Sequence, residues 1–133
     1  MIEIYTDGAY SPSRDRGGIA FVVVKDGVKI YKFLQMIPTN ATNNRMEILS
    51  VIEACLWALK RNYKKITIYS DSMYVIGTMT KSWAKNKNFD LWQTLEKVIS
   101  KLDIKWVHIK GHSGNKYNTI CDYLAVTASH IEN

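Results

Sequence analysis

The chain has 133 residues and carries 18 Lys and Arg against 12 Asp and Glu, which gives it a formal charge of +6. Its hydrophobic share of 47% and charged share of 23% are ordinary for a globular protein and argue against disorder or a fibrous repeat. The longest apolar run is far shorter than the roughly 20 residues of a membrane span, and the N-terminus lacks the basic and apolar stretches of a signal peptide. We therefore expect a single domain over residues 1–133, a cytoplasmic location and no membrane contact. The surplus of positive charge is weak evidence for a polyanionic partner.

The first half of the chain has the pattern of three strands and a long helix. Apolar and polar residues alternate at the N-terminus, which is typical of a strand. The dipeptide Asp26-Gly27 indicates a two-residue hairpin between two β-rich runs, and the spacing of Ile52, Cys55 and Leu59 predicts an amphipathic helix. The predicted elements are a strand over residues 2–7, a Gly/Ser/Pro-rich loop over 8–18, strands over 19–25 and 28–37, a polar loop over 38–44 and a helix over Asn43–Lys60.

The second half alternates between strands and helices. Its predicted elements are a strand over residues 66–70, a helix over 72–80, a basic connecting segment over 81–88, a helix over 90–102, a strand over 104–109, a loop over 111–115 and a helix from about Tyr117. Helical crossovers join parallel strands, so the first, fourth and fifth strands should be parallel and the second antiparallel. The order predicts an α/β protein with a five-stranded mixed sheet and helices on both faces.

Four acids fall where such a sheet brings residues together. Asp7 and Asp71 close the first and fourth strands, and Glu47 and Asp122 lie in the expected first turns of the long and last helices. Each has an ordinary interpretation as a turn residue, a helix cap or a partner of the helix dipole. Their common position, at the carboxyl ends of parallel strands where ligands bind, is better explained by a site.

Clustered carboxylates repel one another unless cations neutralise them. Mg²⁺ prefers a few carboxylates together with water and substrate phosphate. Two such ions would hold the attacking and leaving oxygens of a phosphodiester. We therefore predict two Mg²⁺ ions at this site, with Mn²⁺ as a possible substitute.

The histidines and cysteines receive separate interpretations. His112 lies between two glycines in the loop before the last helix and could move a proton; an exposed loop histidine is the alternative. We assign His108 and His130 to structure or solvent. Cys55 and Cys121 have neither a disulfide framework nor metal-site spacing, so we expect buried free thiols.

Four collinear motifs resemble ribonuclease HI, and the resemblance covers essentially the whole chain. They are Tyr5-Thr6-Asp7-Gly8-Ala9, Thr42-Asn43-Asn44-Arg45-Met46-Glu47, Tyr69-Ser70-Asp71-Ser72, and Lys110-Gly111-His112-Ser113-Gly114 followed by Asn118 and Cys121-Asp122. The resemblance implies the ribonuclease H fold. It also implies an endonuclease that hydrolyses the RNA strand of RNA–DNA hybrids with two metal ions and leaves 3′-hydroxyl and 5′-phosphate ends.

The same resemblance implies roles for individual residues. Asp7, Glu47, Asp71 and Asp122 would be the catalytic, metal-binding carboxylates, and His112 would aid product release or proton movement. The polar residues in the positions that contact the hybrid in this family are Thr42, near a DNA phosphate, and Asn43, Asn44 and Asn118, near the scissile region. Short amides suit the detection of 2′-hydroxyls across a shallow minor groove, although helix capping is the alternative for Asn43 and Asn44. We expect a monomer.

The chain departs from the family pattern in three places. The basic protrusion of some bacterial members is reduced to residues 81–88, where Trp83, Lys85 and Lys87 would supply a stacking face and phosphate contacts. Met73 replaces a residue that is often polar. No separate N-terminal hybrid-binding domain is expected.

Two other functions fit the same fold. A non-catalytic module that binds hybrids or duplexes would have no reason to keep all four acids and the Gly111–Gly114 loop. An integrase-like or junction-cutting nuclease is disfavoured by the spacing of the acids and by the Asn-Arg-Met-Glu segment. Substrate preference would separate all three.

Overall fold

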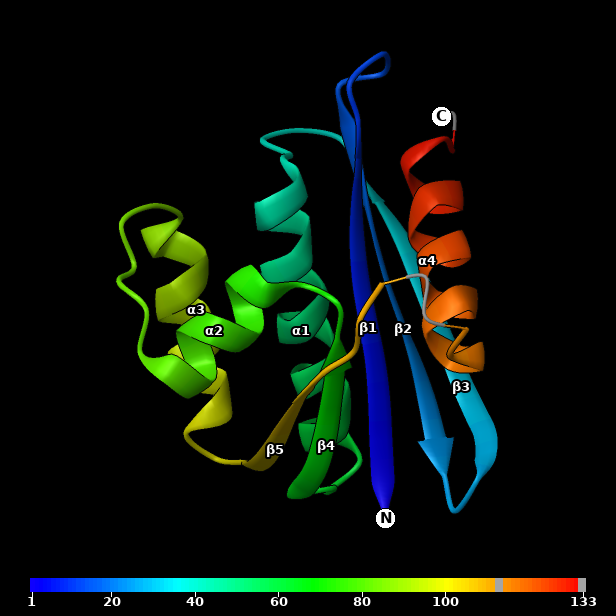
Figure 1. The fold of residues 1–133 in the computed structure, drawn as a ribbon, viewed down its shortest axis with the longest axis vertical. Helices are drawn as coiled ribbons and strands as arrows, with labels where there is room; N and C mark the ends of the chain where they lie inside the picture. Colours follow the sequence, from blue (N-terminus) through cyan, green and yellow to red (C-terminus); the bar gives the residue numbers. More distant parts are fainter. Residues whose placement is uncertain (112–113, 132–133) are drawn as a thin grey trace.

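The computed structural model describes residues 1–111 and 114–131, and this part of the chain forms five strands and four helices (Figure 1). The strands are β1 (Ile2–Ser11), β2 (Arg16–Lys25), β3 (Val28–Ile37), β4 (Lys65–Ser70) and β5 (Asp103–His108). The helices are α1 (Asn43–Lys60), α2 (Met73–Lys81), α3 (Phe89–Ile99) and α4 (Lys116–Ser129). The predicted bounds of β3 and α1 are confirmed without change. None of these helices is long and apolar enough to cross a membrane.

The strands form one mixed sheet in the order β3-β2-β1-β4-β5. β2 is antiparallel to both β1 and β3, whereas β4 is parallel to both β1 and β5. In Figure 1, α1, α2 and α3 lie on one side of this sheet and α4 lies on the other. The predicted five-stranded α/β sheet with helices on both faces is therefore confirmed, including the parallel and antiparallel pairs.

The centre of the sheet is buried on both faces. Because successive side chains of a strand point to opposite faces, Ile4 and Phe21 pack on the α1 side, and Tyr5 and Val22 pack on the α4 side. β1 and β2 are for this reason apolar on both faces, as strands covered by two layers of helices must be. The two layers of the core hold the central strands in place, and with them Asp7.

The first two strands are longer than predicted. β1 continues to Ser11 and β2 begins at Arg16, so the loop predicted over residues 8–18 is confined to residues 12–15, and its predicted bounds are wrong. Gly8 and Gly18 are strand residues whose missing side chains let helices come close. A Cβ on Gly8 would lie 2.3 Å from the backbone carbon of Met46 in α1, and a Cβ on Gly18 would lie 2.1 Å from the carbonyl oxygen of Ala125 in α4. These glycines mark helix packing and not a turn.

The third helix is shorter than predicted and the fifth strand begins earlier. α3 ends at Ile99 and not at Leu102, and β5 starts at Asp103. The backbone N–H of Asp103 donates to the carbonyl of Lys64 at 2.7 Å, just before β4 begins. The chain therefore leaves the helix after Ile99 to pair with β4, although the spacing of the apolar residues predicted helix as far as Leu102.

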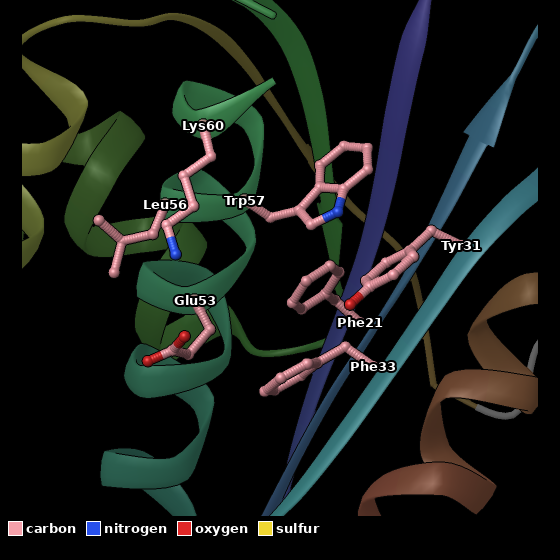
Figure 2. Close-up of a pocket in the computed structure, with 7 residues that line it drawn as sticks. All are labelled: Phe21, Tyr31, Phe33, Glu53, Leu56, Trp57 and Lys60. Carbon is pink, nitrogen blue, oxygen red and sulfur yellow. The ribbon is translucent and has the colours of Figure 1, made fainter. Parts of the chain in front are cut away.

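An aromatic pocket of about 220 Å³ lies between α1 and the β2–β3 hairpin, as Figure 2 shows. Tyr31 and Trp57 stack there with ring centroids 5.4 Å apart, and Phe21 and Phe33 stack at 4.9 Å. The guanidinium of Arg61 lies 5.1 Å from the Trp57 ring. The pocket is part of the packing of α1 on the edge of the sheet, and none of the predicted site residues that the structure describes lines it.

Candidate active site

Two buried carboxylates meet where α1 packs on β1. The backbone N–H of Gly8 donates hydrogen bonds to Asp7 Oδ1, at 2.9 Å, and to Glu47 Oε1. Only 4% of the Asp7 surface and 8% of the Glu47 surface are exposed. The close packing of Gly8 against the α1 backbone, described above, is what places the two acids side by side.

A third carboxylate comes from the end of β4. Asp71 follows the last residue of that strand and precedes Ser72, which caps α2 by accepting a hydrogen bond from the N–H of Val75 at 3.2 Å. β4 pairs with β1 only as far as Tyr69 opposite Tyr5. β1 thus runs on past the end of β4, and Asp7 lies beside the place where β4 stops. Carboxylate oxygens of Asp7, Glu47 and Asp71 lie within 4.8 Å of one another.

Asp122 is the fourth acid and is exposed on α4. It lines the same cavity, of about 390 Å³, as the other three carboxylates, although it is not part of their 4.8 Å group. The placement of Glu47 and Asp122 in first helical turns is wrong: α1 begins at Asn43 and α4 at Lys116, and neither helix has an acid in its first turn. The helix dipole acts mainly on the first turn, so it does not account for either acid.

The electrostatics of the site reflect this crowding. Burial is the largest cause that raises the pKa of Asp7 to about 7; a hydrogen bond with Glu47 comes next and lowers it, and the charges of Asp71 and Asp122 raise it further. Burial, and after it the charge of Asp7, raises the pKa of Glu47 well above its usual value. Asp7 and Glu47 therefore bind protons more readily than ordinary carboxyls do, and a cation would compete with those protons.

The donor set fits a hard divalent cation. All of its side-chain donors are carboxylate oxygens, which Mg²⁺ and Ca²⁺ prefer over nitrogen or sulfur. The cavity of about 390 Å³ is lined by Asn43 and Asn44 as well as by the acids, and both asparagines are exposed to solvent. A cation would offset both the burial of these charges and their mutual repulsion, which together raise the pKa of Asp7 and of Glu47.

The polar residues predicted to contact nucleic acid differ in their surroundings: one caps a helix and two line the cavity. Thr42 caps α1 by accepting a hydrogen bond from the N–H of Arg45 at 3.1 Å, so Asn43 and Asn44 are not the cap. Asn43 Oδ1 accepts a hydrogen bond from the Tyr10 N–H at 3.1 Å. Both asparagines line the cavity with the carboxylates. The structure therefore removes the capping alternative for these two residues.

Asn118 and the histidines complete the predicted set. Asn118 is buried and lines a small recess with Asp71 and Asp122. His112 lies outside the described residues. His108 Nε2 lies 3.3 Å from the backbone oxygen of Asp71, on the exposed end of β5. His130 is the exposed C-terminal cap residue of α4.

The aromatic and basic residues between α2 and α3 lie beside those helices rather than in the cavity. The Trp83 side chain is 46% exposed. Lys85 forms an ion pair with Glu96 of α3, so its availability to a phosphate requires release of that pair. Lys87 is exposed.

Gly8 and Arg45 belong to two of the motifs above, but the sequence alone did not predict a part for them in the site. Gly8 joins β1 to α1, and Arg45 forms a bidentate ion pair with Asp90 at 2.8 and 3.0 Å. The signal for Gly8 was its place directly after Asp7, and that for Arg45 was its place two residues before Glu47. Cys55 and Cys121 are buried and free, as predicted.

Comparisons with known proteins agree with this geometry. Residues 1–130 match the family model for RNase H. A ribonuclease H of Caldanaerobacter subterraneus subsp. tengcongensis is 40% identical over 139 aligned positions, which cover 94% of this chain and 88% of that protein. The RNase H1 of Halobacterium salinarum matches with a TM-score of 0.82 at 25% identity, and LC11-RNase H1, solved in complex with an RNA/DNA hybrid, with a TM-score of 0.82 at 20% identity; each match covers 96% of both chains. By its sequence over nearly its whole length, this chain belongs to the ribonuclease H family.

Proposed function

We propose that the protein is an endonuclease that hydrolyses the RNA strand of RNA–DNA hybrids and leaves 3′-hydroxyl and 5′-phosphate ends. The observation that carries the proposal is the cavity in which Asp7, Glu47, Asp71 and Asp122 lie together with two exposed amides. Membership of the ribonuclease H family supports the same activity.

Asp7, Glu47, Asp71 and Asp122 would hold two Mg²⁺ ions, or Mn²⁺ in their place. When bound, the ions stabilise the charge on the attacking and leaving oxygens of phosphodiester hydrolysis. Asp7 and Glu47 keep a fixed geometry because both accept hydrogen bonds from the Gly8 N–H. His112 of the loop before α4 would carry a proton or aid product release.

The cavity rim would select the hybrid. Asn43, Asn44 and Asn118 offer amide donors and acceptors beside the acids, which suits contact with 2′-hydroxyls and base edges of the minor groove. Thr42 would contact a DNA phosphate. Trp83, with Lys85 and Lys87, would contact the DNA strand by stacking and by charge. The hybrid bound by LC11-RNase H1 is consistent with this assignment.

A non-catalytic binding module remains the alternative. A module that only binds nucleic acid would gain from replacing buried, mutually repelling acids, because their burial is costly and their charge opposes a phosphate backbone. The retention of these acids favours catalysis. We also propose a monomer acting in the cytoplasm, a reducing compartment that suits the buried free thiols of Cys55 and Cys121.

A substrate panel tests the proposal. Labelled RNA–DNA hybrid, double-stranded RNA, double-stranded DNA and a DNA duplex with an internal ribonucleotide tract are each incubated with Mg²⁺ or with chelator. We expect cleavage of the hybrid and of the internal tract with Mg²⁺ only, and RNA products whose mobility changes after phosphatase treatment. Cleavage of the DNA duplex, or of hybrid in chelator, would contradict the proposal, and binding of hybrid without any cleavage would favour the alternative.

A further inference from the structure

Residues 82–88 join α2 to α3, and we call this segment the connector. It carries the aromatic and basic side chains that we expect to contact the DNA strand. Its first and last residues, Ser82 and Asn88, have φ values of 54° and 60°, in the left-handed region. Non-glycine residues enter this region rarely, so the connector turns sharply at both ends and its path depends on what holds those ends.

The first end is held by packing on α2. A Cβ on Gly77 would lie 2.5 Å from Cε3 and Cζ3 of the Trp83 indole, so the ring rests directly on the helix backbone at that glycine. The Lys81 ammonium lies 6.0 Å from the centroid of the same ring. One side of the Trp83 ring is therefore seated on α2, and nearly half of the side chain stays exposed.

The second end is held by hydrogen bonds from Asn88. Asn88 precedes α3 but its side chain does not cap that helix. Its Oδ1 accepts a hydrogen bond from Arg45 Nη1 at 3.3 Å, and its Nδ2 donates one to the Tyr74 hydroxyl at 3.1 Å. The same hydroxyl accepts a hydrogen bond from Trp92 Nε1 at 3.3 Å. The end of the connector is thus tied to α1, α2 and α3.

Arg45 is the residue on α1 in this network. Its Nη atoms donate to both carboxylate oxygens of Asp90, and its Nε donates to the carbonyl of Asn40 at 2.9 Å. The Arg45 side chain is only 14% exposed, against 62% for Asp90. Arg45 follows Asn44 directly and lies two residues before Glu47. The Arg45 guanidinium therefore links the N-terminal end of α1, which carries Glu47, to the Asn88 end of the connector.

We propose that Arg45 is a positioning residue. It holds the connector in a fixed position relative to the N-terminal end of α1, which carries Glu47. A hybrid would then meet Trp83 and the asparagines of the cavity in a preset arrangement, without ordering the connector as it binds. Preset surfaces bind more tightly because less conformational entropy is lost on binding. This inference rests on the proposed cleavage of hybrids, and it adds a residue that determines substrate affinity without touching the substrate.

The planar guanidinium explains why the position is an arginine. Arg45 donates to Asp90, Asn88 and Asn40 at once, in directions that a fork with five N–H donors can satisfy. A lysine at the same place would keep the charge and an ion pair with Asp90. It could not supply all of these bonds in the same geometry, so Arg45→Lys separates the positioning role from the charge.

Two variants and two matched controls test the proposal. Arg45→Lys weakens the network from α1, and Asn88→Gly removes the Asn88 bonds while glycine keeps the left-handed backbone without strain. Arg16→Lys is the control for arginine, because the Arg16 guanidinium bonds only to the Ile131 carbonyl among the described residues. Asn62→Gly is the control for glycine, because Asn62 has the same left-handed backbone, with a φ of 62°, and is exposed outside the connector.

We expect Arg45→Lys and Asn88→Gly each to raise KM for a long hybrid about three- to tenfold while kcat changes less than about twofold. The controls should leave both constants near wild type. In a Trp83→Ala background, Arg45→Lys should have little further effect on KM, because both changes act through the connector. An unchanged KM, a loss confined to kcat, or effects that add to those of Trp83→Ala would overturn the proposal and indicate a structural role only.

Hydrogen–deuterium exchange separates this inference from the proposed function. We expect the amides of residues 82–88 to exchange faster in Arg45→Lys than in wild type or Arg16→Lys, without a substrate present. If wild type cleaves no hybrid but this difference is found, the proposed function fails and the positioning of the connector stands. If wild type cleaves hybrid and exchange is the same in all three proteins, the positioning role fails alone.

Discussion

The backbone N–H of Gly8 donates a hydrogen bond to Glu47 Oε1 and so fastens α1 to β1 where two buried carboxylates meet. The same N–H lies 2.9 Å from Asp7 Oδ1. A strand glycine therefore determines both how closely the helix approaches the sheet and how the first two acids are arranged.

Gly8→Ala should disrupt this junction. The new Cβ would lie 2.3 Å from the Met46 carbon and 2.5 Å from the Glu47 nitrogen, and these are backbone atoms that cannot move without shifting α1. We expect the free energy of unfolding to fall by about 1–3 kcal/mol, and hybrid cleavage to fall more than the folded fraction does. Urea denaturation and initial cleavage rates measure the two effects. Gly27→Asn is the control for the clash, since no described atom lies within 4 Å of its Cβ position and asparagine has the least strain of the larger side chains at a φ of 82°. We expect it to lower stability less than Gly8→Ala and to leave cleavage by the folded protein unchanged; equal losses of cleavage in both variants would contradict the expectation.

Asp7→Asn should abolish cleavage and keep the fold. The amide is nearly isosteric but removes one negative charge from the cluster, so the metal-free variant should be at least as stable as wild type at neutral pH. We expect cleavage with Mg²⁺ to drop by about a thousandfold or more. Asp103→Asn, an exposed acid on β5 outside the cavity, is the control and should cleave normally. Cleavage by Asp7→Asn at a near-normal rate would exclude a metal-binding role for this residue.

The metal-free protein should lose stability as pH rises from about 4 to 7. The folded-state pKa of Asp7 is raised to about 7 and that of Glu47 is raised as well, whereas unfolded carboxyls titrate near 4. Within this range the folded chain binds more protons than the unfolded chain, so the free energy of unfolding falls with pH. We expect a loss on the order of 2 kcal/mol between pH 5 and pH 7.5 in chelator, measured by urea denaturation. Asp7→Asn should show a weaker dependence, and a wild-type stability that rises over this range would contradict the assigned pKa directions.

Added Mg²⁺ should reverse this loss. Cations displace the protons held by the clustered carboxylates and stabilise only the folded chain. We expect the Tm of wild type to rise with Mg²⁺ concentration, more at pH 7.5 than at pH 5, because protons compete with the cation at the lower pH. Thermal unfolding followed by circular dichroism, with K⁺ at equal ionic strength as control, measures the effect. The rise should be much smaller in Asp7→Asn, and an equal rise in both proteins would place cation binding elsewhere.

Much of the fold was predictable because its signals are local. The Asp26-Gly27 turn and the spacing of apolar residues after Asn43 specify β3 and α1, and both have the predicted bounds. The directions of β1, β2, β4 and β5 followed from the order of strands and helices along the chain. The error over residues 8–18 arose at Gly8 and Gly18, because glycine signals a turn and a close approach of two elements equally well, and only the helix packed against it distinguishes them.

The sequence by itself predicted that four acids and two asparagines would lie together, because these residues stand in ordered motifs whose chemistry can be identified without coordinates, and they line one cavity. The tertiary structure decided how these residues act together. It placed Asp7 inside a strand and not at its end, left Asp122 exposed beside three closely grouped carboxylates, and brought Arg45 to Asn88 across 43 positions of the chain. Such contacts depend on how β1, α1 and α3 pack against one another, and packing between distant elements leaves no periodic or turn signal in the sequence.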